Sequence, residues 1–407
     1  MDNREFAADA QRLLEENILP FWSTVMVDNR RGGFYGRQDG NGTIVEDAPR
    51  GAILNARILW SFSAAYRVLR RREYLDIATR AHDYMLRHFI DKEYGGVFWS
   101  VDADGNPLDT KKQTYAIGFA IYGFSEYARA TGDEQALRTA IDLYRQIEAH
   151  CYDPVNGGYH EAMTREWQPM GDMRLSDKDE NCDKTMNTHL HVIEPYTNLY
   201  RVWRDGGLRQ QILGLVDVFT DKLLNPSTGH LDLFFNTEWQ GRRDIESFGH
   251  DIEASWLLDE TAAVIGDEAL TRRLAPIVKR IADASEEGLN SDGSLTGERW
   301  KADCHTTAER DWWVQCECVI GEMNMAMRTT GEESRAYMKR ALDCYDYIKR
   351  RLVDWKNGEW FWSVSPDGTP NRCDDHAGFW KCPYHNTRMC LEIIERQNCV
   401  TTCKNCG

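Results

Sequence analysis

Hydrophobic positions along the chain form two kinds of helical segment that alternate. The stretch 52–69 is rich in Leu, Ile, Trp and Phe, whereas 73–89 has the one-sided pattern of an amphipathic helix. The same pair recurs at 114–130 with 134–150, and at 186–203 with 208–224. In each pair we expect the more hydrophobic helix to lie inside the fold and the amphipathic helix to face solvent.

A glycine-centred turn flanked by aromatic residues separates successive pairs. Sequences such as GGFYGRQDGNG, GGVFWSVDADGNPLD and NGEWFWSVSPDGTP combine short alternating runs with Asp-Gly or Asn-Gly, which is typical of β-hairpins. The turns recur at intervals of 63, 62, 71, 64 and 65 residues, anchored on Gly33, Gly96, Gly158, Gly229, Gly293 and Gly358. Six turns at near-equal intervals indicate a repeat architecture.

Six units with two helices each predict an all-α fold, an (α/α)6 barrel with the short β-hairpin loops gathered at one end. A unit of this length has room for two helices and their loops. No Pro/Ser-rich linker divides the chain. We therefore expect a single barrel domain over residues 1–397, followed by a cysteine-containing tail over 398–407.

Polar and aromatic residues recur where the hairpin loops meet the more hydrophobic helices. Positions 57, 115, 187, 250, 313 and 385 are separated by 58, 72, 63, 63 and 72 residues, close to the repeat length. Equivalent positions in a closed barrel converge at one mouth, so we expect one pocket. The candidate residues are Arg57, Tyr115, Asn187, His191, Glu194, His250, Glu253, Trp312, Trp313, Glu317, Trp380 and His385.

The histidines among these candidates suggest proton transfer. His191 and His250 are each followed three residues later by a glutamate, which lies on the same helical face. A neighbouring carboxylate orients an imidazole and raises its pKa. Two such histidines across a pocket can remove a proton from one face of a carbon and return it to the other. A single histidine on an inner helix is more often a hydrogen-bonded core residue, but the recurrence at repeat positions favours a catalytic role.

The aromatic candidates favour a sugar as the ligand. Trp312, Trp313, Trp380 and Tyr115 offer flat apolar faces for a pyranose ring, while Arg57 and Asn187 can read its hydroxyl groups. The alternative is that tryptophans fill a wide barrel, and with 14 of them in the chain several do so.

Charge and composition exclude several classes of partner. The chain has 49 basic and 65 acidic residues, a net charge of −16, without a basic run, so we expect no nucleic-acid and no membrane partner. The polar N-terminus and the lack of a long apolar stretch indicate a cytoplasmic protein. Most of the 12 cysteines are then reduced thiols, including Cys399, Cys403 and Cys406 in a frayed tail.

The sequence predicts neither a metal nor a nucleotide cofactor. His189 and His191 are two positions apart and point to different sides of a helix. The Glu-x-x-His order of di-iron bundles is reversed here, and no zincin, P-loop or dinucleotide-binding motif is present.

Long stretches of the chain resemble the N-acylglucosamine 2-epimerase superfamily. The most specific are NARILWSFSAAY, DKTMNTHLHVIEPY, SFGHDIEASWLLDE, RDWWVQCECVIGE and GFWKCPYHNTRMC. Within that superfamily the chain is similar to the members that act on disaccharides. The resemblance implies an (α/α)6 barrel, no redox cofactor, and C2 epimerisation of the reducing-end glucose of β-1,4-linked disaccharides through ring opening and a cis-enediolate. Cellobiose would become glucosyl-mannose, and lactose would become epilactose.

The resemblance also implies roles for the candidate residues. His250 and His385 would be the proton-transfer pair, His191 would assist, and Arg57 would hold the sugar oxygens. Trp380 and either Trp312 or Trp313 would cover the sugar rings. Tyr115, Asn187, Glu194, Glu253 and Glu317 complete the expected substrate-binding set. We expect a monomer acting on a small-molecule disaccharide.

Three alternatives stay open at this point. Another isomerase could use the same scaffold: an N-acylglucosamine 2-epimerase, a mannose 2-epimerase or an aldose–ketose isomerase. A glycoside hydrolase would need two carboxylates about 5–10 Å apart, for which Glu253 and Glu317 are the candidates. The third alternative is a non-catalytic sugar-binding protein, which the histidines argue against.

Overall fold

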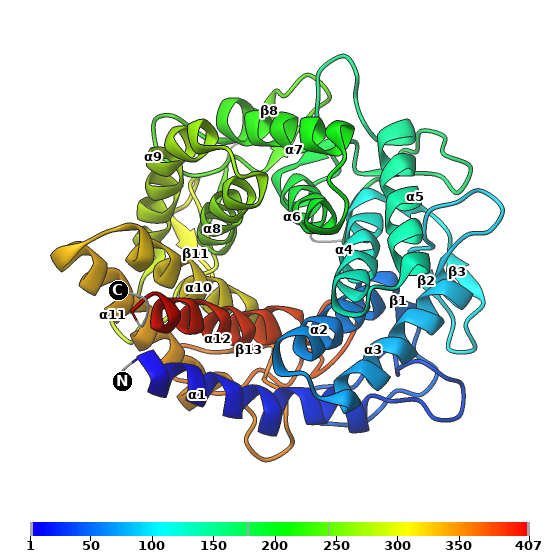
Figure 1. The fold of residues 1–407 in the computed structure, drawn as a ribbon, viewed down its shortest axis with the longest axis horizontal. Helices are drawn as coiled ribbons and strands as arrows, with labels where there is room; N and C mark the ends of the chain where they lie inside the picture. The colour runs from blue at the N-terminus through cyan, green and yellow to red at the C-terminus, as the bar shows by residue number, and fades with distance from the viewer. Residues whose placement is uncertain (1–2, 177–178, 243, 405–407) are drawn as a thin grey trace.

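Twelve α-helices form two concentric rings in the computed structural model, which describes residues 3–176, 179–242 and 244–404 (Figure 1). The inner ring consists of α2 (Ala52–Leu69), α4 (Thr114–Thr131), α6 (Met186–Val202), α8 (Phe248–Ile265), α10 (Trp312–Arg328) and α12 (Tyr384–Lys404). The outer ring consists of α1 (Asn3–Leu13), α3 (Arg72–Tyr84), α5 (Glu134–His150), α7 (Gly206–Val218), α9 (Glu268–Ser285) and α11 (Gly331–Tyr347). The predicted (α/α)6 barrel is confirmed.

Most outer helices end in a short turn of different pitch. Wider π-helical turns follow α1, α3, α7 and α11, and a 3-10 turn follows α9. They are η1 (Leu14–Ile18) with η2 (Phe21–Val25), η3 (Met85–Phe89), η4 (Phe219–Leu223), η6 (Ile348–Leu352) and η5 (Glu286–Gly288). The amphipathic segments expected at 73–89 and 208–224 therefore hold, with π geometry in their last turn.

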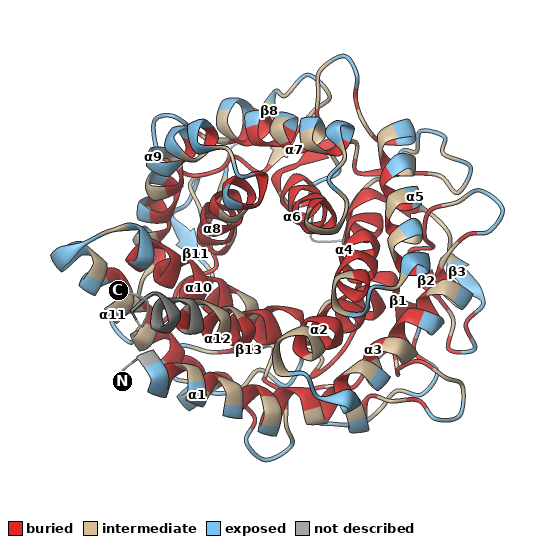
Figure 2. Cartoon of the chain, viewed as in Figure 1, coloured by how far each residue is buried: buried red, intermediate tan, exposed pale blue. Residues whose placement is uncertain are grey.

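Burial follows the two-ring arrangement (Figure 2). The inner helices are buried over most of their length, and the outer helices expose only the face turned away from the barrel. Trp22, Trp256 and Trp360 are among the largest fully buried side chains. The ring closes where α12 contacts α10 and α2 and is covered by α1, so the two ends of the chain complete the barrel together.

The six glycine turns share one geometry. An antiparallel bridge closes each turn, for example Ile90 with Val97 and Tyr152 with Tyr159. All six anchoring glycines have a positive φ, between 62° at Gly33 and 93° at Gly293, a region in which a side chain is strained. The backbone thus explains why glycine recurs at this interval.

Small antiparallel sheets connect neighbouring repeat units by backbone hydrogen bonds at the loop end of the barrel. Strand β1 pairs with β2, so the residues before α2 are joined to the hairpin of the next unit. Similar pairs precede α4, α6, α8 and α10, which fixes where each inner helix begins. The strands are β1 (Arg50–Gly51), β2 (Ser100–Val101), β3 (Pro107–Asp109), β4 (Lys112–Gln113), β5 (Ala162–Met163), β6 (Lys184–Thr185), β7 (Phe234–Phe235), β8 (Gly241–Arg242), β9 (Ile245–Ser247), β10 (Glu298–Trp300), β11 (His305–Thr306), β12 (Arg310–Asp311) and β13 (Ser363–Val364).

The C-terminal helix reaches beyond the expected domain boundary. The backbone of α12 remains helical to Lys404, although a tail was expected from residue 398. The side chains of Cys399, Cys403 and Cys406 lie outside the described residues, so the division at 397 stays a prediction. The nine cysteines whose side chains are described are free thiols. Within the described part of the chain, no helix has the length and apolarity needed to cross a membrane.

Candidate active site

A cavity of about 570 Å³ lies at the loop end of the barrel, where the first turns of all six inner helices meet. Ten of the twelve residues expected from the sequence line it: Arg57, Tyr115, Asn187, His191, His250, Glu253, Trp312, Trp313, Trp380 and His385. Glu194 and Glu317 lie behind this layer and contact its histidines. The repeat spacing therefore places these residues around one pocket.

His191 lies at a kink in α6. Its backbone has φ −91° and ψ 16°, outside the helical range, because Pro195 has no N–H to donate to the His191 carbonyl. Helix α4 approaches that carbonyl closely at Gly118, where an added methyl group would lie 2.5 Å from the oxygen. The Nδ1 atom of His191 is 3.0 Å from Oε2 of Glu194, which confirms the expected His–Glu pair.

His250 has a different partner from the one expected. Its Nδ1 atom is hydrogen-bonded to the hydroxyl of Ser247 at 2.7 Å, and Glu253 instead accepts a hydrogen bond from Arg388 at 2.6 Å. The i, i+3 spacing puts His250 and Glu253 on one helical face, but the guanidinium from α12 offers the carboxylate a charged partner. The predicted His250–Glu253 pair is therefore wrong.

His385 receives the carboxylate contact that the sequence did not indicate. Its Nδ1 atom is 2.7 Å from Oε1 of Glu317, which comes from the neighbouring helix α10. The ring of Trp313 packs against both His250 and His385. The distance between ring centroids is 4.7 Å to His250 and 5.8 Å to His385. Both imidazoles thus face the same part of the cavity.

Arg388 holds three buried carboxylates together at the bottom of this arrangement. Its guanidinium contacts Glu194, Glu253 at 2.6 Å and Glu317 at 2.7 Å. Burial raises the pKa of Glu253 and of Glu317. At Glu194 burial is the largest single effect, but the charge of Arg388 together with the His191 and Tyr384 contacts outweighs it and lowers the pKa to about 2. One arginine neutralises one of the three carboxylates, so a proton is retained among the others.

The histidine pKa values shift opposite to the sequence expectation. Burial is the largest cause in each case, and it outweighs the carboxylate partners. Burial and His191 lower the pKa of His250 to about 3. Burial, followed by the charges of Arg57 and Arg388, holds the pKa of His385 well below its usual range. The resting imidazoles are therefore neutral and able to accept protons.

This shift predicts the pH dependence of the reaction. A histidine that accepts a proton from the substrate acts in its neutral form, and a lowered pKa keeps it neutral to lower pH. We expect the acid limb of kcat/KM to fall clearly below the ordinary imidazole pKa of about 6.5. Initial rates across the acid to neutral range test this, and a limb at or above the ordinary value would contradict it.

Arg57 is positioned to bind oxygen atoms in the pocket. Its guanidinium donates to the Tyr115 hydroxyl at 2.9 Å and lies over the rings of Phe119 at 4.1 Å and Tyr384 at 4.8 Å. These contacts fix the charge without a carboxylate partner. Oδ1 of Asn187 is buried and has no hydrogen-bond partner among the described residues, so it is an acceptor available to a ligand hydroxyl.

The two adjacent tryptophans are not equivalent. Trp312 is buried and packs edge-on against Trp362 at 5.0 Å, so it forms part of the wall. Trp313 is half-buried and lies between the histidines. Trp380 is half-buried on another side of the cavity and packs against Tyr115 and Trp99, each at 5.9 Å. Trp313 and Trp380 are thus partly open aromatic faces of the cavity, as is Trp362.

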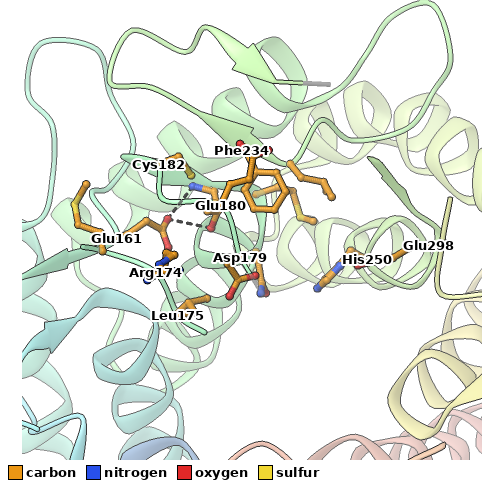
Figure 3. A pocket seen from close by; sticks show the side chains of 14 residues that line it. Glu161, Arg174, Leu175, Asp179, Glu180, Cys182, Phe234, His250 and Glu298 are labelled. Carbon is orange, nitrogen blue, oxygen red and sulfur yellow. Dashed lines mark hydrogen bonds between the residues drawn. The ribbon is translucent and has the colours of Figure 1, made fainter. Parts of the chain in front are cut away.

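A smaller cavity of about 60 Å³ adjoins the main one and shares its lining at Asn187 and His250 (Figure 3). Its wall includes Glu161, whose carboxylate accepts hydrogen bonds from the Thr185 backbone at 2.7 Å and from the Thr188 hydroxyl at 2.6 Å. Burial raises the pKa of Glu161 to about 8. This carboxyl group anchors the first turn of α6, on which Asn187 and His191 stand.

Glu253, Glu317 and His385 also have the composition of a metal site, since their ligand atoms lie within 4.8 Å of one another. Arg388 occupies that position with a permanent charge, because its Nη2 donates to both carboxylates. The cluster is therefore built around a guanidinium.

Comparison with known proteins agrees with this geometry. The family model of N-acylglucosamine 2-epimerase (GlcNAc 2-epimerase) matches residues 33–388. The chain belongs to this family. The match extends from the first glycine turn to Arg388, so it includes all twelve candidate residues and the arginine that organises them.

Within the N-acylglucosamine 2-epimerase family, the chain is similar to proteins named for one activity. It is 53% identical over 386 residues to the cellobiose 2-epimerase of Bacteroides fragilis, covering 95% of this chain and 98% of that protein. It is 39% identical to the cellobiose 2-epimerase of Ruminococcus albus, covering 96% and 98%. The solved structure of cellobiose 2-epimerase from Bacillus thermoamylovorans superposes with a TM-score of 0.91 at 40% identity, covering 97% and 100%.

Several residues of this family site were not identified from the sequence. Arg388 and Tyr384 both contact Glu194, and Trp362 lines the cavity. Arg388 carries a usable signal, because it stands one turn after His385 in an inner helix. The loop residues that also line the cavity carry none: Arg37, Leu175, Ser176, Asp179, Cys373, Asp374 and Asp375.

Proposed function

We propose that this chain is a cellobiose 2-epimerase that interconverts glucose and mannose at the reducing end of β-1,4-linked disaccharides. Cellobiose becomes glucosyl-mannose and lactose becomes epilactose. One observation carries the proposal: two neutral histidines, His250 and His385, open into one cavity on either side of Trp313. The 53% identity to a protein of that name supports the substrate class.

The reaction begins with opening of the sugar ring. Only the open-chain aldehyde acidifies the hydrogen at C2, so a proton must move from the C1 hydroxyl to the ring oxygen. The imidazoles at the cavity wall are the groups that can relay it. Arg57 and Asn187 then hold the oxygens at C1 and C2.

Proton transfer at C2 follows. One histidine of the pair takes the C2 proton, and its imidazolium is stabilised in the case of His385 by Glu317 at 2.7 Å. The electron pair passes to the aldehyde oxygen and gives a cis-enediolate, whose charge lies close to the Arg57 guanidinium. The other histidine, after taking up a proton from solvent, delivers it to the opposite face of C2, and the first histidine returns the proton it removed to solvent. His191, held by Glu194, assists proton transfer at the sugar oxygens.

The aromatic faces account for preference for a disaccharide. Trp313 lies beside the reacting carbon, and Trp380 lies farther out, next to Trp99 and Phe379. We assign the reducing-end ring to Trp313 and the second sugar to Trp380. The other isomerases of this scaffold act on one ring and would gain nothing from the outer face.

A substrate panel tests the proposed function. We expect kcat/KM for cellobiose and lactose to exceed that for glucose, mannose and N-acetylglucosamine, with a reducing-end mannose as the product. Trp380→Ala should raise KM for cellobiose about tenfold, as expected for the loss of one ring-stacking contact, while the rate with glucose stays unchanged. A preference for N-acetylglucosamine or mannose would overturn the disaccharide assignment.

The carboxylate geometry disfavours a glycoside hydrolase. Both oxygens of Glu317 are engaged, Oε1 by His385 and Arg388 and Oε2 by the Trp256 indole at 3.0 Å. Glu253 is bound to the same guanidinium nitrogen, so the two carboxylates do not flank a cleavable bond. Release of free glucose from cellobiose in the panel would revive this alternative.

We also propose that the enzyme is a cytoplasmic monomer. Free thiols at fully buried positions such as Cys316 and Cys390 support a reducing compartment. Light scattering of the purified chain tests the oligomeric state, and a mass of two or more chains would contradict the monomer.

A further inference from the structure

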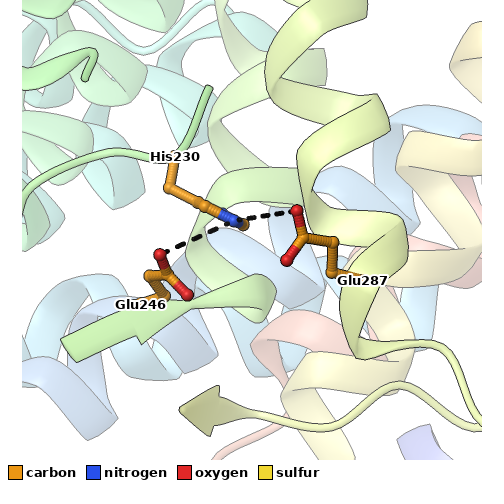
Figure 4. Close-up of side chains that lie close together, drawn as sticks. All are labelled: His230, Glu246 and Glu287. Carbon is orange, nitrogen blue, oxygen red and sulfur yellow. Dashed lines mark ion pairs between the residues drawn. The ribbon is translucent and has the colours of Figure 1, made fainter. Parts of the chain in front are cut away.

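A second cluster of titratable groups lies outside the cavity, where β9 leads into α8 (Figure 4). The Nε2 atom of His230 faces Oε1 of Glu246 at 3.9 Å and Oε1 of Glu287 at 3.8 Å. The His230 side chain is only 2% exposed, and within the described part of the chain its Nε2 has no hydrogen-bond partner. A buried imidazole nitrogen thus points between two carboxylate oxygens.

Neighbouring groups orient all three side chains. Nδ1 of His230 is hydrogen-bonded to Asp251 at 2.7 Å, which fixes the ring with Nε2 turned toward the two glutamates. A carboxylate behind a histidine is the usual support of a metal-ligating imidazole. Arg299 binds Oε2 of Glu246 and Oε2 of Glu287, each at 2.7 Å, so both Oε1 atoms turn toward His230.

We propose that His230, Glu246 and Glu287 form a binding site for a divalent cation of the Mn²⁺ class. One imidazole nitrogen and two carboxylate oxygens are a donor set that such ions accept, with water completing the coordination. The carboxylates of Glu246, Glu287 and Asp251 outnumber the cations Arg299 and Lys301 by one, an excess that a proton on His230 balances when no ion is bound. A bound cation compensates that excess.

Lys301 is the competitor for this site. Its ammonium lies 2.9 Å from Oε1 of Glu246, one of the proposed ligand atoms. The Lys301 side chain is 32% exposed, so it can turn into solvent when an ion binds. Removing this charge should therefore tighten binding rather than weaken it.

The proposed cation site is connected to the catalytic cavity through two residues that are adjacent in sequence to its members or to His250. Ser247, directly after Glu246, is hydrogen-bonded to His250, and Asp251 directly follows His250. A cation that ties β9 to η5 stabilises the start of α8, from which His250 projects. Its role is structural, and it takes no part in the sugar chemistry.

Electron paramagnetic resonance of Mn²⁺ tests the proposal on the untagged protein. Manganese is the probe because the cysteine thiols would compete for Zn²⁺. We expect one bound Mn²⁺ per chain, with a rise in the thermal midpoint of about 3 °C near saturation. His230→Ala and Glu287→Gln should weaken binding at least about tenfold, and Lys301→Met should strengthen it. Replacing the exposed His305 by alanine should leave binding unchanged, because His305 lies on β11, which β10 separates from β9.

Two results would overturn the proposal. If the signal of free Mn²⁺ is unchanged in the presence of wild-type protein at millimolar Mn²⁺, no ion binds. The cluster is then an ion-pair network in which a proton on His230 balances the carboxylates. Binding that survives Glu287→Gln but is lost in His385→Ala would place the ion in the catalytic cavity. Glu287 is half-exposed, so its variant keeps the proposal testable even where His230→Ala fails to fold.

Discussion

Replacing His250 or His385 with asparagine is expected to lower kcat for cellobiose epimerisation at least about 100-fold. Each imidazole faces the cavity with a lowered pKa, and the proposed reaction needs a base on one face of C2 and an acid on the other. An amide retains hydrogen bonding but cannot exchange protons. Initial rates at saturating cellobiose measure the effect.

Partial reactions separate the two roles. A variant that lacks one histidine still has the base for one epimer, so it should exchange the C2 hydrogen of that epimer with solvent without forming the other. His250→Asn and His385→Asn should show opposite preferences between cellobiose and glucosyl-mannose. Loss of exchange from both epimers in both variants would contradict a two-base mechanism.

His189 offers a matched control on an inner helix. It is buried and hydrogen-bonded to the backbone of Thr185 at 2.6 Å and of Tyr159 at 2.9 Å, and it does not line the cavity. His189→Gln should lower stability and leave kcat within a few-fold of wild type. A residual kcat of that size in His250→Asn or His385→Asn would remove that histidine from the mechanism.

Arg388 is the site of the second large effect. Arg388→Met leaves Glu194, Glu253 and Glu317 without their shared partner, and an uncompensated buried charge costs about 3–5 kcal/mol of stability. The activity should fall as well, because Glu194 and Glu317 orient His191 and His385. Denaturant unfolding and kcat measure the two losses.

Two further variants and a pH profile distinguish positioning from simple destabilisation. Arg388→Lys keeps the positive charge but loses the planar guanidinium, whose N–H groups reach several carboxylates at once. The fold should therefore persist, and kcat should be lower. Arg388→Met combined with Glu194→Gln removes one charge of each sign, because Glu194 is the carboxylate of the cluster with a lowered pKa, and should recover part of the stability. The acid limb of kcat/KM should move up in Arg388→Met, because the Arg388 charge lowers the pKa of His385.

Arg396 is the control for these measurements. It lies two turns farther along α12, also over the Trp256 ring, and pairs with Glu392 at 2.7 Å away from the cavity. Arg396→Lys should leave kcat and its pH profile unchanged. An Arg388→Lys variant that behaves like Arg396→Lys would mean that the carboxylates need only a charge and no fixed geometry.

The fold was predictable because the repeat consists of residue types that the local backbone conformation and burial require. Each turn needs a glycine at a positive φ, and the inner helices are buried over most of their length. These local requirements recur every unit and therefore show in a single sequence. The pairing of β1 with β2, which joins one unit to the next, is a tertiary contact with no local pattern.

The repeat predicted which residues lie around the pocket, but it did not predict their hydrogen-bond partners. Residues at the first turn of each inner helix converge by symmetry, as Arg57, Asn187 and His250 do. Partner choice among them depends on distances across the barrel, so Ser247 beside His250 and Glu317 beside His385 could not be assigned from spacing. The raised histidine pKa values expected from neighbouring glutamates were wrong because burial is the larger effect.

The central claim is that the chain inverts C2 of a reducing-end glucose by proton exchange. Incubation with cellobiose in D₂O, followed by NMR of the sugar, tests it most directly. We predict a reducing-end mannose that carries deuterium at C2, with the glycosidic bond intact. An unchanged cellobiose spectrum, or a mannose product that retains its original C2 hydrogen, would contradict this mechanism.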